Sequence, residues 1–169
     1  MQNLNFKICL KNKSDNKVKL ASMSKEKNSE SSIAHRAVNK MLEEDHFSAW
    51  LGIEVLKIEE GRCHLKLKVR KEMLNGFGIL HGGVAFSMAD SALAFAVNAY
   101  GRIAPLIQGS MNYSKSAKEG DELLAVAEVI SLGNKKADVD VNIFCNQEKE
   151  AFYFFRGTVY RTSKSLLNP

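Results

Sequence analysis

The most hydrophobic stretch of the sequence covers residues 84–100, where apolar side chains occupy nearly every position and Gly101 follows. Glycine often stands just past the end of a helix, so this pattern predicts a helix of about 18 residues that stops at Gly101. A helix that is apolar on nearly every side belongs in the interior, and its many alanines allow another backbone to approach closely. We therefore expect the rest of the chain to fold around it.

Strand signals flank this helix. At residues 63–70 apolar and polar positions alternate, which is typical of a strand with one solvated face, and His64 falls on that face. Earlier, apolar residues recur at helical spacing over residues 33–49, and a strand is predicted at residues 50–58. After the helix, strands joined by short turns are predicted at residues 104–113, 122–132, 136–144 and 151–161.

This order of elements predicts the fold class. Strands, one long buried helix and then consecutive strands with short connections favour an antiparallel sheet wrapped around a central helix, an α+β fold. In the last strand Phe152, Tyr153, Phe154 and Phe155 are apolar on both faces, which places this strand between layers or at an interface. A chain of 169 residues is long enough for one domain with one core.

The net charge of +5 is unevenly distributed. Residues 1–32 hold seven lysines against Asp15, Glu26 and Glu30, which leaves the remainder nearly neutral. The composition of this segment predicts a disordered basic tail, with the folded domain at residues 33–169, and Met23 is an alternative start. Because the charge belongs mostly to the tail, no nucleic-acid partner is expected.

Cysteine and histidine spacing gives no metal site. Cys9, Cys63 and Cys145 include no Cys-x-x-Cys pair, which favours a reducing, cytoplasmic compartment. The four histidines, His35, His46, His64 and His81, lack metal-ligand spacing, so we expect neither a metal nor another cofactor. The longest unbroken apolar run, residues 92–97, is too short to span a bilayer, and no membrane segment is predicted.

The candidate chemistry lies at the start of the long helix. A glycine-rich loop carries Asn75 and His81, the pair Gly82-Gly83 opens the helix, and Asp90 is a carboxylate inside the apolar run. Burying an unpaired carboxylate is costly, so Asp90 should be hydrogen-bonded, shifted in pKa or used in chemistry.

These residues carry a family resemblance. The run from Asn75 through His81-Gly82-Gly83 to Asp90, together with Gly120-Asp121 and residues 155–158, resembles the PaaI-type hotdog-fold acyl-CoA thioesterases, the phenylacetic acid degradation family. The resemblance covers roughly residues 35–162, although Ser116-Ala117 stands where the family often has a proline.

The resemblance implies a sheet curled round one long helix and thioester hydrolysis without a metal. It also implies a homodimer with a continuous sheet that assembles to a homotetramer, and an acyl-CoA substrate, with phenylacetyl-CoA and other aryl-acetyl or medium-sized acyl groups first. In this family a polar residue on the strand after the helix contacts the catalytic water, and Gln108 and Ser110 are candidates for that contact.

The motif suits thioester hydrolysis on physical grounds. Negative charge develops on the carbonyl oxygen, and the free backbone N–H groups at Gly82 and Gly83 would face it, with the helix dipole behind them. Asp90 would either attack the carbonyl or activate a water as general base, and the sequence leaves both open. Asn75 would order the water or thioester, and His81 would fix the loop or polarise the carbonyl.

Each residue also has a structural explanation. Asp90 could bond to Ser87 or Ser91, His81 could cap the helix, and Asn75 could simply shape a turn. Core or interface packing is the favoured role of Phe86, Phe95 and Tyr100, and Lys118 and Arg156 are ordinary surface charges unless coenzyme A phosphates lie nearby. As function classes, a non-catalytic acyl-CoA-binding module and a hotdog hydratase remain alternatives.

Helix geometry predicts a shared site. Gly82 and Asp90 are separated by about 12 Å along one helix axis, at 1.5 Å per residue, whereas a thioester carbonyl must lie about 3 Å from both. One chain cannot supply both groups. We therefore expect Asn75, His81 and Gly82 of one subunit to face Asp90 of a two-fold-related partner.

Overall fold

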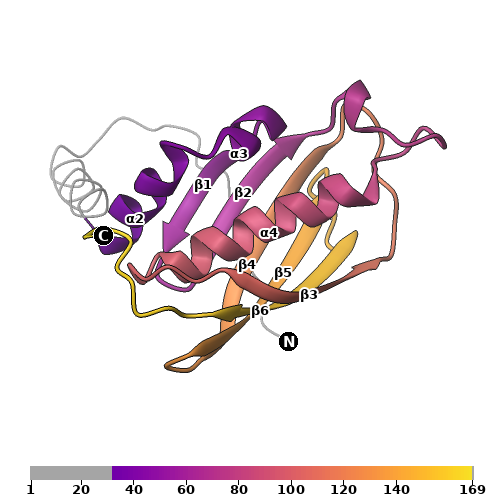
Figure 1. Ribbon diagram of the computed structural model, residues 1–169. Coiled ribbons are helices and arrows are strands. Elements are labelled where there is room, and N and C mark those ends of the chain that lie inside the picture. Colours follow the sequence, from indigo (N-terminus) through magenta and orange to yellow (C-terminus); the bar gives the residue numbers. More distant parts are fainter. Residues whose placement is uncertain (1–31, 169) are drawn as a thin grey trace, which may run out of the picture. The chain divides into compact units, whose positions relative to one another are not determined.

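The computed structural model describes residues 32–168, and the basic tail predicted at residues 1–32 lies outside the described residues except for Ser32. The described chain forms one six-stranded sheet with the long helix α4 against it (Figure 1). In chain order the elements are α2 (Ile33–Leu42), α3 (His46–Leu51), β1 (Glu54–Glu59), β2 (Arg62–Lys68), the 3₁₀ turn η1 (Lys71–Met73), α4 (Gly82–Asn98), β3 (Leu106–Tyr113), β4 (Glu122–Leu132), β5 (Lys136–Cys145) and β6 (Tyr153–Tyr160).

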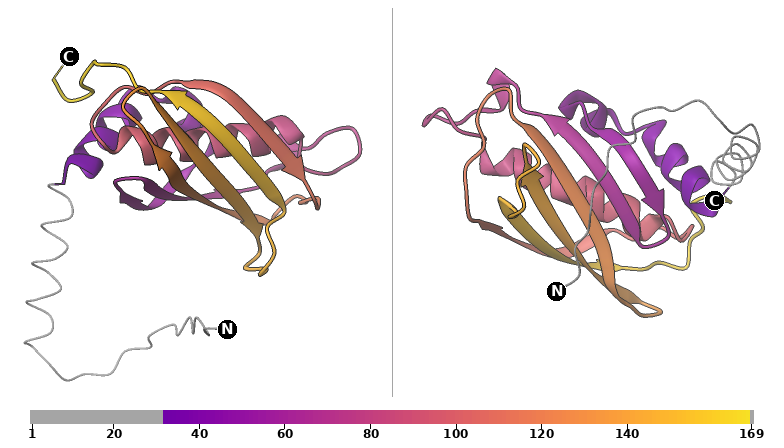
Figure 2. Two further views of the ribbon diagram at one scale, coloured as in Figure 1. Left: turned by 90° about the horizontal axis from the view of Figure 1, so that it is seen from below. Right: turned by 180° about the vertical axis from the view of Figure 1, so that it is seen from behind.

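The sheet has the strand order β1-β2-β4-β5-β6-β3, and every neighbouring pair is antiparallel. Helix α4, which follows β2 and η1 in the chain, runs along one face of the curved sheet (Figure 2). The predicted α+β fold with a central helix is therefore confirmed. Among the strands of residues 32–168, β1 and β3 pair on one side only and form the two edges.

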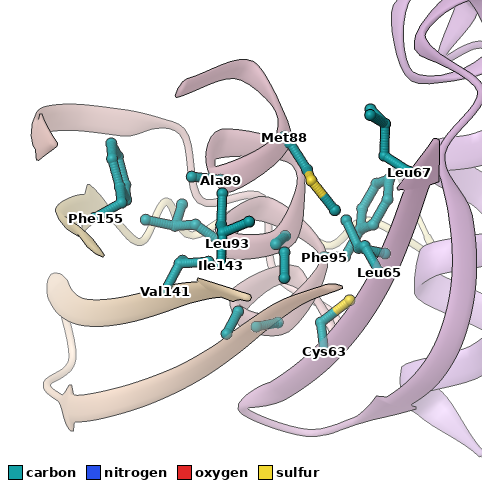
Figure 3. Close-up of a cluster of buried hydrophobic side chains, with 14 of the residues drawn as sticks. Cys63, Leu65, Leu67, Met88, Ala89, Leu93, Phe95, Val141, Ile143 and Phe155 are labelled. Atoms are coloured by element: carbon teal, nitrogen blue, oxygen red, sulfur yellow. The ribbon is translucent and has the colours of Figure 1, made fainter. Parts of the chain in front are cut away.

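Helix α4 supplies the centre of the core. Its buried side chains include Met88, Leu93 and Phe95, which meet side chains of β2 and β5 in the cluster shown in Figure 3. Fully burying a side chain of this size contributes about 1.5–3 kcal/mol. The helix ends at Asn98. Gly101, with φ 78°, has the left-handed conformation typical of a glycine just past a helix end, as predicted.

The strand β6 shows how closely the sheet approaches this helix. A Cβ on Gly157 would lie 2.6 Å from Cδ1 of Leu93, so only glycine fits at this point. Phe155 is fully buried beneath the helix, whereas Phe154 lies half-buried on the outer face, 5.7 Å from the Arg156 guanidinium. Strand β6 lies between β3 and β5 in the sheet, and its inner face packs against α4. That its outer face is covered by a further layer or an interface stays a prediction.

The predictions for the N-terminal part of the domain need correction. Instead of one helix over residues 33–49 and a strand over residues 50–58, the chain forms two helices, and Trp50 belongs to the second. Asp45 starts α3 because its carboxylate accepts a hydrogen bond from the Ser48 N–H at 2.9 Å, and Gly52, with φ 74°, ends it. The strand β1 therefore begins only at Glu54.

The outer face of the sheet is polar where alternation predicted it. On β5 the Asp138 and Asp140 carboxylates accept hydrogen bonds from Thr158 at 2.7 Å and from Arg156 at 2.6 Å. His64 lies half-buried on the outer face of β2, and burial together with the charge of Lys57 lowers its pKa. None of the helices in residues 32–168 has the length and apolar character needed to cross a membrane.

Candidate active site

The loop before α4 is a closed turn organised by Asn75. Its ends are joined by a bridge between Leu74 and Leu80, and the Asn75 N–H donates to the Ile79 carbonyl at 2.8 Å. The side-chain oxygen of Asn75 accepts from the N–H of Phe77 at 2.9 Å and from that of Ile79 at 3.4 Å. The Asn75 side-chain oxygen therefore stabilises the turn. Among the described residues, none accepts a hydrogen bond from the Asn75 side-chain NH₂.

His81 caps the start of α4. Its Nδ1 accepts a hydrogen bond from the Gly83 N–H at 2.9 Å, and its backbone N–H donates to the Met73 carbonyl at 2.8 Å. With Nδ1 as the acceptor, the neutral ring carries its proton on Nε2. The capping role is confirmed, and it leaves the exposed Nε2–H able to donate to a carbonyl oxygen.

Gly82 presents a backbone N–H in the first turn. Within residues 32–168 no hydrogen bond uses this N–H, whereas the Gly83 N–H is taken by His81. The Gly82 carbonyl accepts from the Tyr113 hydroxyl at 3.2 Å, which fixes this peptide against the end of β3. An unpaired N–H at the positive end of a long helix is suited to an anion or a developing oxyanion. Of the two glycines, Gly82 therefore has the available donor.

Asp90 lies half-buried two turns further along α4. The two serines that could have bonded it are otherwise engaged, since Ser87 donates to the Gly83 carbonyl at 2.8 Å and Ser91 bonds the Ser48 hydroxyl at 3.0 Å. No hydrogen bond within the described chain reaches the Asp90 carboxylate. Burial, and secondarily the negative charge of Asp45, raise the pKa of Asp90 above its usual value of 3.8, which makes it a better proton acceptor when ionised.

The two halves of the motif stay apart within one chain. Asn75, His81 and Gly82 cluster at the start of α4, but Gly82 and Asp90 belong to the same continuous helix, so about 12 Å of helix axis separates them. The structure therefore brings the loop residues together and leaves Asp90 outside their reach.

Gln108 and Ser110 lie on the far side of the sheet. They pair with Thr158 and Arg156 of β6 and are exposed, whereas Gly109 between them faces Phe155 and the core. Side chains on alternate positions of a strand point to opposite faces, so neither residue shares a face with α4 of its own chain. Within one subunit the structure does not bring them to Asp90.

The other side chains considered from the sequence have structural contacts. Phe86 packs edge-on against Phe155, Phe95 is fully buried, and Tyr100 lies beneath the Arg161 guanidinium at 5.7 Å. Arg156 is paired with Asp140. Cys63 and Cys145 are free thiols, and burial raises their pKa values to about 12 and about 11. Within residues 32–168 no cluster of potential ligands could hold a metal ion.

Two contacts of the site lie outside what the sequence pattern predicts. Tyr113 sits against Gly82, and no local signal in the sequence marks this long-range contact. Helix α3 lies beside Asp90 through the Ser48–Ser91 hydrogen bond, and here a signal existed: Asp45 stands three residues before Ser48, as a helix-capping residue does.

Comparison with known proteins identifies the family. The thioesterase superfamily profile matches residues 77–152. The acyl-coenzyme A thioesterase PaaI of Escherichia coli K12 is 33% identical over 76% of this chain and 94% of its own. The structure of the E. coli PaaI protein from the phenylacetic acid degradation operon matches with a TM-score of 0.76 at 32% identity, over 79% of this chain and 96% of that one.

Two further solved structures agree. A mutant of the phenylacetic acid degradation protein PaaI of Thermus thermophilus has a TM-score of 0.66 at 30% identity, over 69% of this chain and 98% of its own. A Streptococcus mutans protein bound to acetyl-CoA has a TM-score of 0.64 at 29% identity, over 67% of this chain and 90% of its own. Sequence and architecture thus point the same way, and the chain belongs to the PaaI-type hotdog-fold acyl-CoA thioesterases of the thioesterase superfamily, a family of thioester hydrolases.

Proposed function

We propose that this chain hydrolyses an acyl-CoA thioester to a free acid and coenzyme A, with Asp90 as the reacting carboxylate. The observation that carries the proposal is the Asp90 carboxylate itself, half-buried, raised in pKa and without a hydrogen-bond partner in the described chain. Such a carboxylate is costly to keep in a core helix, which favours a chemical role. The acetyl-CoA bound to the S. mutans relative supports the substrate class.

The reaction assigns a task to each group. As general base, ionised Asp90 takes a proton from water while the water oxygen attacks the thioester carbon; as nucleophile, its oxygen attacks directly and water then cleaves the mixed anhydride. In both routes negative charge collects on the carbonyl oxygen, where the Gly82 N–H and the His81 Nε2–H would donate. Collapse of the tetrahedral intermediate breaks the carbon–sulfur bond, and the coenzyme A thiolate leaves. Asn75 would orient the water or thioester through its side-chain NH₂.

The site requires two subunits in this proposal. The Gly82 N–H and Asp90 lie on one rigid helix, so the partner's helix would run antiparallel beside it and supply the complementary group. The edge strand β3, which pairs only with β6 among the described strands, would join the partner's β3 and continue the sheet. Because Gln108 and Ser110 lie on the outer face of β3, they would reach another subunit across this β3 pairing or, if dimers assemble to a homotetramer through the outer sheet faces, across that contact.

Aryl-acetyl or other medium-sized acyl groups are the proposed substrates, and the pathway assignment of the E. coli relative supports them. We place the enzyme in the cytoplasm, which the free buried thiols Cys63 and Cys145 favour. Neither proposal requires a metal or cofactor.

Release of coenzyme A thiol, followed with a thiol reagent, tests the function. Wild type should liberate one thiol per acyl-CoA consumed, and Asp90→Asn should liberate almost none. Loss of acyl-CoA without thiol release would identify a hydratase, and binding without turnover would identify a non-catalytic module. Either result would overturn the proposal.

A further inference from the structure

Helix α3 is fixed directly beside Asp90. The Ser48 hydroxyl of α3 bonds the Ser91 hydroxyl at 3.0 Å, one residue from Asp90, and Asp45 at the start of α3 is near enough for its charge to act on the Asp90 carboxyl. Ser48 is buried, so this contact belongs to the packed interior. Helix α3 therefore packs beside the segment of α4 that carries the proposed reacting carboxylate, with the buried Ser48 on the contact side.

The short helix is held at both ends. At its start Asp45 accepts from the Ser48 N–H at 2.9 Å. At its end the Arg70 guanidinium donates to the Leu51 carbonyl at 2.7 Å and to the Trp50 carbonyl at 2.9 Å, which satisfies carbonyls that the helix itself leaves unpaired. Side chains on α3 are thus presented from a rigid base.

Two large aromatic side chains occupy its exposed surface. Phe47 is 53% exposed and Trp50 is 59% exposed, and their rings stack with centroids 6.0 Å apart and planes at 28°. Neither ring is part of the core cluster. A stacked, preformed aromatic pair offers a flat apolar surface that a planar ligand group can cover without reorganisation.

The charges nearby restrict what can cover it. Glu44 and Asp45 immediately precede the helix, and Asp90 lies on the adjoining one. The Arg70 guanidinium at the end of α3 is paired with Glu72, so negative charge predominates in this region. The phosphates of coenzyme A would be repelled here, whereas an uncharged acyl group would not.

We propose that Phe47 and Trp50 form a wall of the acyl-binding subsite and favour flat aromatic acyl groups over short aliphatic ones. This proposal rests on the hydrolytic function proposed above, since it assigns the acyl end of the same substrate. It attributes the acyl preference of this chain to two residues of α3.

Binding can be tested independently of turnover because Trp50 is the single tryptophan of the chain. Tryptophan emission, excited at a wavelength that adenine does not absorb, is followed while the Asp90→Asn protein is titrated with phenylacetyl-CoA, acetyl-CoA or coenzyme A. Phenylacetyl-CoA should shift the emission, and coenzyme A alone should not. Equal responses to all three, or none to phenylacetyl-CoA, would overturn the proposal, even for a protein that hydrolyses nothing.

Turnover tests specificity. Trp50→Ala and Phe47→Ala should each lower the ratio of kcat/KM for phenylacetyl-CoA to that for acetyl-CoA by about 10-fold, the size expected when an apolar contact is lost. Trp50→Phe should restore most of the ratio. The matched control is Leu56→Ala on β1, which removes a 55% exposed side chain from the groove between α2 and β1 and should leave the ratio unchanged.

Other outcomes of the turnover and emission experiments would contradict one of the two proposals. An unchanged ratio in both alanine variants refutes the acyl wall. Equal losses for both substrates with a lower oligomer mass would show that the pair is an interface between copies, and this also refutes it. If wild type releases no thiol but the emission shift depends on the aryl group, the hydrolytic proposal fails and the acyl subsite stands.

Discussion

The backbone of Gly82 lies against the ring of Tyr113. The Tyr113 hydroxyl donates to the Gly82 carbonyl at 3.2 Å, and a Cβ built on Gly82 would lie 3.2 Å from Cε1 of that ring. The contact joins the end of β3 to the first turn of α4, where the proposed oxyanion donor sits. A side chain at this position would therefore be tight against the ring, although the φ of Gly82 is not in the left-handed region.

Gly82→Ala should reduce both activity and stability. The added methyl group must displace the Tyr113 ring by a few tenths of an ångström, or move the first turn of α4. Since a misplacement of about 1 Å at a reacting centre can lower the rate by about 10²-fold, this smaller shift should lower kcat by up to about 10-fold. Overpacking typically costs about 1–3 kcal/mol of unfolding free energy. Steady-state kinetics and thermal unfolding measure both. Gly76→Ala is the control, because nothing lies within 4 Å of a Cβ there; equal activity in the two variants would contradict the prediction.

Asp90→Asn should keep the fold and lose hydrolysis. The amide is nearly isosteric with the carboxylate but neither accepts a proton nor attacks, so kcat should fall by about 10² to 10⁴-fold for loss of a general base, and further for loss of a nucleophile. Circular dichroism confirms the fold, and thiol release gives the rate. Retention of more than about a tenth of wild-type turnover would be incompatible with a general-base or nucleophilic role.

The same variant should be more stable than wild type near neutral pH. Because the folded-state pKa of Asp90 is raised, the folded protein binds more protons than the unfolded one between the ordinary value of 3.8 and the raised value. Ionisation of Asp90 therefore lowers the free energy of unfolding as pH rises through this window, and below the window this loss is absent. Asp90→Asn removes that loss, so its Tm should exceed that of wild type at pH 7 and not below about pH 4.

The pH dependence of activity should respond to Asp45. Asp90 must be ionised to react, so activity should rise with pH through its pKa, which burial and the Asp45 charge hold above 3.8. Asp45→Asn keeps a capping oxygen for the Ser48 N–H but removes the charge. The acidic limb of the kcat/KM profile should therefore move to lower pH with the plateau unchanged. A limb at the wild-type position would show either that the Asp45 charge does not act on Asp90 or that Asp90 does not control the limb.

How well the sequence predicts each element depends on how many residues carry its pattern. Helix α4 was predictable because 17 residues of apolar sequence, a glycine start and Gly101 agree. Helix α3 has only six residues, too few to show a helical period, so the sequence pattern predicts a strand at Trp50 although Asp45 and Gly52 mark the helix ends. The grouping of Asn75, His81 and Gly82 is predictable because the three residues lie close together in the chain. The Gln108 side chain points to the outer face because the pairing of β3 with β6 shifts in register between Leu106 and Gln108. The sequence pattern does not indicate this shift.

Residues 1–30 should be dispensable for folding and catalysis. A chain that begins at Ser31 keeps Ser32, whose hydroxyl caps α2 by accepting from the His35 N–H at 3.2 Å. Thermal unfolding and thiol release should therefore match those of the full chain. A Tm lower by several degrees would show that the removed segment packs on the domain.

Mixed subunits should recover activity that neither variant has alone. An Asp90→Ala chain keeps the loop, His81 and Gly82, and a His81→Ala chain keeps Asp90; a two-fold dimer of one of each holds one site with both intact halves and one with neither. Random exchange makes half of the dimers mixed, each with one of two sites working, so activity should reach about a quarter of wild type if one intact pair suffices. The control mixes two differently tagged Asp90→Ala preparations, which should stay inactive while co-purification of the tags proves exchange. If exchange is complete and the Asp90→Ala and His81→Ala mixture stays equally inactive, His81 and Asp90 act from one chain or not together, and the geometry of α4 then requires a different donor for the oxyanion.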